Sequence, residues 1–274
     1  MVPLALLAAS AIFGIDGKLN ADEAMRVSEQ AQDEYSCAVE KFNQRKKDAE
    51  KSLQTLGETK LNIYGTQIRD FVSAFSILKE TQLREGSGIK ELEKLSFDDK
   101  QFEQLKLDTL ENEKLLESNP TRDVFLSWGI GGMVGLAFYH SKTKGQKDDA
   151  YANLAIVKKR AAEMELVEEQ FYIIQKNAEQ LQSFFERFSK IMDKANQNLY
   201  QIVEQKKEWN MLMSDEKDKV IVALKTVQIL KAMIDMPLLG EDGMLTKDIC
   251  DILSQRENVL KVFGDQTGLP KMKF

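Results

Sequence analysis

The sequence has 274 residues, of which 30% are charged, and its formal net charge at pH 7 is −6. It contains only 4 prolines, a composition that favours helices throughout and predicts an all-α fold. Because no basic surface dominates, nucleic acid is not an expected partner. The length allows one domain or two small ones, and we expect a single elongated helical domain over residues 1–274.

The N-terminal stretch MVPLALLAASAIFGI, residues 1–15, is apolar. It lacks the basic start of a signal peptide, but Ala8-Ala9-Ser10 resembles a cleavage site, so secretion stays open. The stretch is also short for a spanning helix, which needs about 20 residues. It is interpreted either as a buried terminal helix or as a membrane-active segment. The large apolar side chains of that segment are Leu4, Leu6, Leu7, Ile12 and Phe13.

A long amphipathic helix is predicted from Asn20 to about Arg84, because apolar residues recur there mostly in steps of three or four. Asn20 and Glu23 have the spacing of a capping box at its start. Gly57 and Gly65 lie inside this helix, where glycine is unfavourable. They are expected to mark slight bends or close contacts with other helices.

The first helical region continues after a break at Gly-Ser-Gly, residues 86–88. Residues 89–118 form a second amphipathic piece, so the long helix and this return together cover 20–118. The pair Asn119-Pro120 ends it, because the residue before a proline avoids the helical conformation.

A second long helix is predicted over residues 149–213. Its apolar residues alternate steps of three and four, which is typical of a heptad seam in a packed helix pair. The seam consists of Phe171, Ile174, Ala178, Leu181, Phe185, Phe188, Met192, Ala195, Leu199 and Ile202. The two long helices match in length, so we expect an elongated antiparallel bundle with the glycine-rich stretch near one end.

The C-terminal helices are predicted over residues 214–274. Ser214 and Asp215 are typical of a helix start, and Pro237 ends the helix that follows. A loop leads to a final short helix from Leu245 to about Phe263. No segment has the period-two pattern that predicts a strand.

Residues 124–139, VFLSWGIGGMVGLAFY, contain four glycines and no charge. Gly131 and Gly135 have the small-xxx-small spacing that lets apolar helices approach closely in lipid. Sixteen residues are few for a span, so they favour a hairpin, a re-entrant segment or a tongue that is hidden until needed. The alternative is a buried core hairpin that closes one end of the bundle.

The membrane-insertion residues predicted from this stretch are Val124, Phe125, Leu126, Trp128, Gly129, Ile130, Gly131, Gly132, Met133, Val134, Gly135, Leu136, Phe138 and Tyr139. A basic flank follows it in the sequence. There Lys142, Lys144 and Lys147 are expected to contact anionic lipid headgroups.

Residue types that carry chemistry are sparse. A single histidine, His140, makes acid–base and metal sites improbable, and no phosphate-binding loop occurs. Cys37 and Cys250 are far apart and match no metal-binding spacing. We therefore expect no enzyme activity, no catalytic residues, no cofactor, no metal and no small-molecule substrate.

The layout of two long helices, the apolar insert 124–139 and the apolar start 1–15 resembles the helical pore-forming toxins of the cytolysin A and haemolysin BL type. That resemblance implies an elongated bundle whose sheltered apolar tongue inserts into a membrane when the protein oligomerises. The A-x6-A spacing of Ala24, Ala31 and Ala38 and the stretch LGETKLNIYG also look like a group of bacterial glycine-rich helical proteins without an assigned function.

Two functions stay open at this point. The first is a membrane-inserting bundle that converts from a soluble to a membrane-bound form, as a pore-former or one component of a multi-part pore. Its partners are a lipid membrane and either further copies of the chain or related helical subunits. The second is an intracellular coiled-coil scaffold or adaptor that works beside a membrane-remodelling NTPase, since long heptad seams often pair with a partner chain.

Overall fold

The computed structural model describes residues 21–85, 99–131, 154–205, 209–240 and 244–268. All regular secondary structure in these ranges is helical, and the single isolated bridge pairs Leu239 with Leu245. The prediction of an all-α fold is therefore confirmed. The apolar start 1–15 and the Asn20 cap lie outside the described residues.

The chain divides into two compact units. The first combines residues 1–52 with 137–176, and the second combines residues 53–136 with 177–274. Two long helices contribute to both units: α2 (Ala21–Ile63) and α8 (Leu154–Val203).

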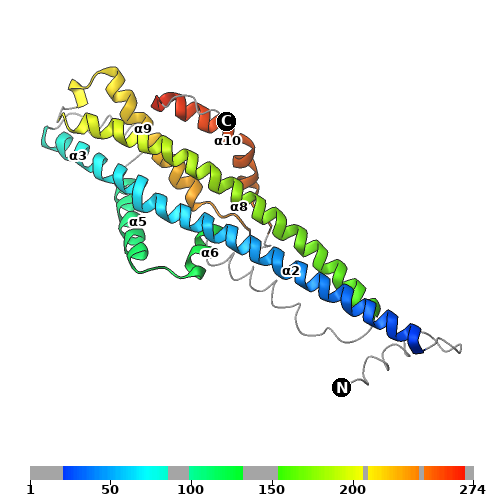
Figure 1. The fold of residues 1–274 in the computed structure, drawn as a ribbon. Helices are drawn as coiled ribbons and strands as arrows, with labels where there is room; N and C mark the ends of the chain where they lie inside the picture. The colour runs from blue at the N-terminus through cyan, green and yellow to red at the C-terminus, as the bar shows by residue number, and fades with distance from the viewer. Residues whose placement is uncertain (1–20, 86–98, 132–153, 206–208, 241–243, 269–274) are drawn as a thin grey trace. The chain divides into compact units, whose positions relative to one another are not determined.

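In the first unit, α2 and α8 lie side by side (Figure 1). The rings of Phe42 and Phe171 pack with their centroids 5.5 Å apart, and both side chains are buried. The guanidinium of Arg45 lies 5.2 Å from the centroid of the Tyr172 ring. An apolar contact inside and a cation–π contact outside together hold this helix pair.

In the second unit, the chain continues from α2 through a π-helical segment, η1 (Tyr64–Ile68), into α3 (Arg69–Glu85). The prediction of one helix to about Arg84 is thus correct in extent, with a wider turn around Gly65. The buried residues of this continuous helix form the core of the second unit. The buried apolar residues are Leu53, Leu56, Leu61, Ile63, Tyr64, Ile68, Phe71, Ala74, Phe75 and Leu78.

The two long helices run parallel in the second unit, so the prediction of antiparallel partners is wrong. Lys60 lies over the ring of Phe185, Gln67 contacts Asn196, and Asp70 contacts Tyr200. Residue numbers rise together along both helices in these pairs. Equal lengths indicated partners but carried no information on direction.

The helix α5 (Asp99–Glu117) makes the parallel arrangement possible, because it carries the chain back along α3. Phe75 packs edge-on against Phe102 with centroids 5.1 Å apart, and Arg69 lies 3.5 Å from Glu113. Residue numbers fall on α5 as they rise on α3, so this pair is antiparallel. Helix α6 (Arg122–Ile130) follows after Pro120 (Figure 1).

Helix α8 ends at Val203, ten residues before the predicted end at 213. After Val203 the next buried residue in the described chain is Trp209, a step of six that breaks the helical period. A 3₁₀ turn (Trp209–Met211) then leads to α9 (Ser214–Asp235). At the start of α9, the carboxylate of Glu216 accepts a hydrogen bond from the backbone N–H of Met213 at 2.9 Å.

Helix α9 ends before Pro237, as predicted, and α10 (Lys247–Thr267) is the last described helix. It continues past the predicted end near Phe263 and stops at Gly268, whose left-handed φ of 74° is typical of a helix C-terminus. Both guanidinium nitrogens Nη1 and Nη2 of Arg187 on α8 lie 2.9 Å from the carboxylate of Glu257 on α10.

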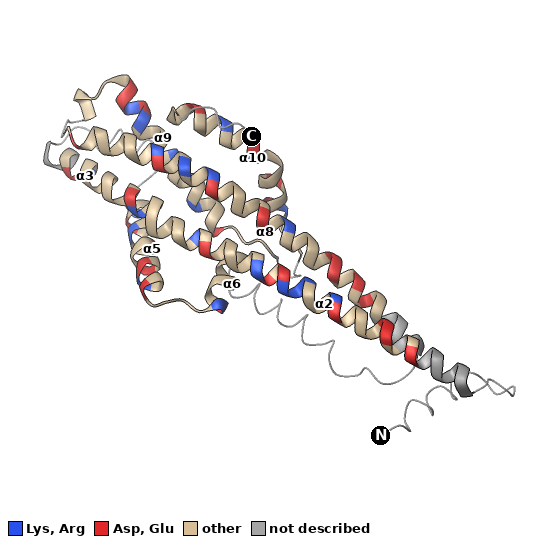
Figure 2. Cartoon of the chain, viewed as in Figure 1, with Lys and Arg blue, Asp and Glu red and all other residues tan. Residues whose placement is uncertain are grey.

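The predicted seam on α8 is buried within the chain at every position from Phe171 to Ile202. Charged residues of both signs are interspersed on the outer faces of the helices (Figure 2). The steps of three and four in the sequence therefore identified the buried face of α8 correctly.

Candidate functional site

The unusual glycine-rich stretch is represented by α6, which contains its first seven residues, 124–130. The carbonyl of Thr121 accepts hydrogen bonds from the N–H groups of Val124 and Phe125, at 3.1 and 3.3 Å, and so begins the helix. Gly131 ends it with a φ of 97°, a left-handed conformation that favours glycine. The only charges on α6, at Arg122 and Asp123, lie in its first turn (Figure 2).

A pair of glycines brings α6 into backbone contact with α2. A methyl group on Gly57 would lie 1.9 Å from the carbonyl oxygen of Phe125, and one on Gly129 would lie 2.0 Å from the carbonyl oxygen of Leu53. Neither position has room for any side chain. Glycines permit this close approach of two helices, as they do in membrane helix pairs. The expectation that Gly57 marks a close helix contact is therefore correct.

The face of α6 that meets the bundle buries few large side chains. Leu126, Ser127, Gly129 and Ile130 are buried, so that only two of the buried residues are large and apolar. Val124, Phe125 and Trp128 are half-buried. The ring of Trp128 packs on the ring of Tyr64, with centroids 5.8 Å apart at a steep angle. The helix therefore meets the bundle through two buried apolar side chains, the half-buried Trp128 and a close backbone contact.

The C-terminal end of α6 is bonded to the segment that follows α9. The N–H of Leu238 donates to the carbonyl of Ile130 at 2.7 Å, and the N–H of Leu239 reaches the same oxygen at 3.4 Å. A methyl group on Gly131 would lie 2.2 Å from the Cα of Pro237. The orphan carbonyl at this helix end is therefore satisfied by another part of the chain.

The same segment after α9 is bonded to α2. The side chain of Lys60 is only 1% exposed, and its Nζ donates to the carbonyl of Met236 at 3.4 Å. The hydroxyl of Tyr64 donates to the carboxylate of Asp235 at 3.3 Å. A cation suits this position, because the C-terminal carbonyls of a helix carry partial negative charge.

Burial is the largest influence on the pKa of Lys60 and on that of Tyr64. It lowers the pKa of Lys60 to about 8, and the charge of Asp235 opposes that shift only in part. Burial, with the charge of Asp235, raises the pKa of the Tyr64 phenol. For Lys231, burial works to lower the pKa, but hydrogen bonds to Asp235 and Asp108 outweigh it and raise the pKa overall.

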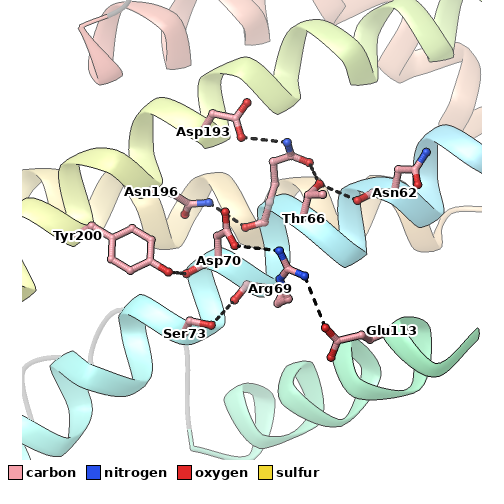
Figure 3. A network of polar contacts seen from close by, with 10 residues as sticks. Asn62, Thr66, Arg69, Asp70, Ser73, Glu113, Asp193, Asn196 and Tyr200 are labelled. Atoms are coloured by element: carbon pink, nitrogen blue, oxygen red, sulfur yellow. Dashed lines mark hydrogen bonds and ion pairs between the residues drawn. The ribbon is translucent and has the colours of Figure 1, made fainter. Parts of the chain in front are cut away.

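The π-helical segment is surrounded by polar contacts (Figure 3). Asn196 on α8 donates its amide to the carbonyl of Gln67 at 2.8 Å, and the hydroxyl of Tyr200 donates to the carbonyl of Asp70 at 3.1 Å. The amide of Gln67 also reaches the carboxylate of Asp193 at 2.9 Å. A π turn changes the normal helical pairing of carbonyls, and α8 supplies side-chain donors beside it.

Replacing Tyr200 with Phe tests the contribution of this network. The change removes the donor to the Asp70 carbonyl and leaves the ring in place, so we expect a loss of about 1 kcal/mol in the free energy of unfolding. Urea denaturation measures it, with Tyr172→Phe, an exposed tyrosine on α8, as the control. A loss equal to that of the control would show that the bond does not stabilise the π segment.

The described residues offer no candidate metal centre. No group of three or more His, Cys, Asp or Glu side chains there is arranged to hold a metal ion. Cys37 and Cys250 are exposed free thiols. The docked helix α6 and the buried side chains of Lys60 and Tyr64 beside it are the distinctive features of the described residues.

The structure places only part of the predicted insertion site. Val124 to Gly131 lie on α6 and its end, where they pack as described. The remaining predicted residues of the insert (Gly132, Met133, Val134, Gly135, Leu136, Phe138 and Tyr139) lie outside the described residues, and so do Lys142, Lys144 and Lys147. The five N-terminal apolar residues lie outside them as well.

Sequence reasoning missed the partners of α6. The pairing of Gly57 with Gly129 joins residues far apart in the chain, and nothing in either local sequence indicates the other. Lys60 carried a usable signal, because it lies four residues after Leu56 and four before Tyr64, on the inward face. A lysine in that position predicts a buried amine with a specific acceptor.

No protein-family profile, curated protein or solved structure matches this chain. Of the described helices, none combines the length and the apolar character needed to cross a bilayer.

Proposed function

We propose that the protein is a membrane-inserting helical bundle, a pore-former or one component of a multi-part pore, and that residues 124–139 are its insertion element. The observation that carries this proposal is the way in which α6 is docked. An apolar helix is held against the bundle by two glycine contacts and one terminal clamp, with few large side chains buried.

The docking of α6 is compatible with opening of this helix at a lower cost than unfolding of the bundle. Full burial of Leu126 and Ile130 contributes about 3–6 kcal/mol by the usual values for such side chains, and the half-buried Val124, Phe125 and Trp128 add to it. Whole domains are stable by about 5–15 kcal/mol, and their local units open at lower cost than the whole. A nine-residue helix with this small buried face is a suitable unit for local opening.

The side chains of α6 are also suited to a lipid environment once the helix is free. Beyond Arg122 and Asp123 the helix is uncharged, and Phe125 and Trp128 provide aromatic groups for the membrane interface. Gly129 would allow close packing against another helix in lipid, which supports assembly with further copies of the chain or related helical subunits. Burial of apolar surface in the bilayer would drive the conversion.

The adaptor function has less support than it had from the sequence. It depended on a seam available to a partner chain, and that seam is buried inside this chain from Phe171 to Ile202. We therefore retain the membrane-directed function as the proposal.

Release of dye from liposomes tests this function. Purified protein is added to dye-loaded vesicles that contain anionic lipid, and leakage and flotation with the vesicles are measured. The variant Gly135→Asp places a charge in the apolar stretch and should abolish both, since a charge at membrane depth costs about 2.5–3.5 kcal/mol.

Gly264→Asp is the matched control, because it makes the same change on α10, where an added side-chain carbon meets nothing within 4 Å. It should leave leakage and flotation close to the wild-type level. Wild-type protein that neither floats with vesicles nor releases dye would overturn the proposed function.

A further inference from the structure

We infer that residues 235–239, here named the latch segment, hold α6 in its docked position, and that opening of this segment is the step that precedes insertion. The inference rests on the proposed function. It adds to the insertion element the segment that releases this element. The supporting observations are the contacts that the latch segment makes with α6 on one side and with α2 on the other.

Toward α6, the latch segment supplies the bonds at the helix end. The Leu238 N–H donates to the Ile130 carbonyl at 2.7 Å, and Pro237 lies against Gly131 so closely that no side chain fits between them. Leu238 itself is fully buried. These contacts cap the C-terminal end of α6 at Gly131.

Toward α2, the latch segment is bonded through Met236 and Asp235. Their partners are the buried amine of Lys60 and the hydroxyl of Tyr64. The ring of Tyr64 also packs against Trp128 of α6. One short segment therefore contacts both helices whose glycines meet, and its displacement would remove the hydrogen bonds that hold the C-terminal end of α6.

The latch segment is supported from outside by a few bonds of a small loop. The hydroxyl of Thr246 donates to the carbonyl of Pro237 at 2.8 Å, and the Thr246 N–H donates to the carbonyl of Leu238 at 3.1 Å. The Gly240 N–H donates to the carbonyl of Met244 at 2.8 Å. Because these bonds do not involve the α8 seam, they can break while the seam stays packed.

Thr246→Val tests this inference, because it removes the hydroxyl that bonds Pro237 and keeps the shape of the side chain. The hydroxyl makes no capping bond to α10, so the helix start is not the target of the change. Hydrogen–deuterium exchange of full-length protein without lipid is measured by mass spectrometry. Loss of one such bond should speed exchange of residues 124–131 about fivefold.

Thr81→Val is the matched control, because its hydroxyl bonds only within its own helix, to the carbonyl of Ile77. It should leave exchange of residues 124–131 unchanged, and the α8 seam at residues 181–199 should be unchanged in both variants. The inference is overturned if Thr246→Val leaves exchange of α6 unchanged. It is equally overturned if α6 and the seam accelerate together, because α6 would then not open separately.

A vesicle arm separates this result from the proposed function. If α6 exchanges faster in Thr246→Val and the variant also releases dye faster, both the role of the latch segment and the proposed membrane function are supported. If α6 exchanges faster but neither protein binds vesicles of anionic lipid, the latch segment controls α6 and the membrane function is wrong.

Discussion

Replacing Gly57 with Ala is expected to destabilise the protein by about 3 kcal/mol or more. The new methyl group would lie 1.9 Å from the carbonyl oxygen of Phe125, where the backbone of α6 must move away. In an exposed helix the same change gains up to about 1 kcal/mol from helix propensity. Overpacking of a close backbone contact exceeds that gain, since such changes force side-chain and backbone shifts that cost about 1–3 kcal/mol and occasionally more. Urea denaturation measures the effect.

Gly264→Ala is the matched control for this prediction. Gly264 lies inside α10, and an added methyl group meets nothing within 4 Å. This change should stabilise the protein by about 0.5–1 kcal/mol, because alanine is the better helix former. If Gly57→Ala were also neutral or stabilising, the close contact between α2 and α6 would be contradicted.

Replacing Lys60 with Met is expected to change how stability depends on pH. The pKa of Lys60 is lowered to about 8 by burial, from 10.5, so between these values the unfolded chain binds more protons than the folded chain. The contribution of Lys60 to stability therefore rises with pH in this window. Relative to Lys60→Met, the wild type should gain about 2–3 kcal/mol between pH 7 and pH 10.

The sign of this effect follows from burial. Below pH 8 the amine is charged in both states, and the folded state carries the full cost of a buried charge. Above pH 10.5 it is neutral in both. Denaturation at several pH values measures the difference, with Lys219→Met, an exposed lysine on α9, as the control for loss of a lysine. A wild-type advantage that stays constant from pH 7 to pH 10 would contradict the buried position of Lys60.

Periodicity was enough to predict which faces of the helices lie inside. The α8 seam and the apolar positions of α2 and α3 recur in steps of three or four, and packing against other helices buries them. The end of α8 was harder to predict, because the polar residues that follow Val203 are of the same types as polar residues inside a helix. The buried Trp209, six residues beyond Val203, is the signal that the period ends.

Direction and partners could not be read from the same pattern. A heptad seam is satisfied by a parallel or an antiparallel neighbour, so the direction of α8 against α2 depended on the path of the connecting chain. That path includes α5, which runs back along α3. At Gly65 the sequence shows only a glycine at an unfavourable position inside a helix, which does not specify a π turn. At Gly57 it indicates only that another helix could approach closely, and not that this helix is α6.

Quenching of Trp128 fluorescence by brominated lipids tests most directly whether α6 enters the membrane. The sequence has 2 tryptophans, so Trp209→Phe leaves Trp128 on α6 as the single reporter. If α6 inserts, we expect anionic vesicles with brominated acyl chains to quench this fluorescence and unbrominated vesicles to leave it unquenched. Equal fluorescence with both kinds of vesicle would contradict insertion and would leave α6 as a permanent part of the bundle.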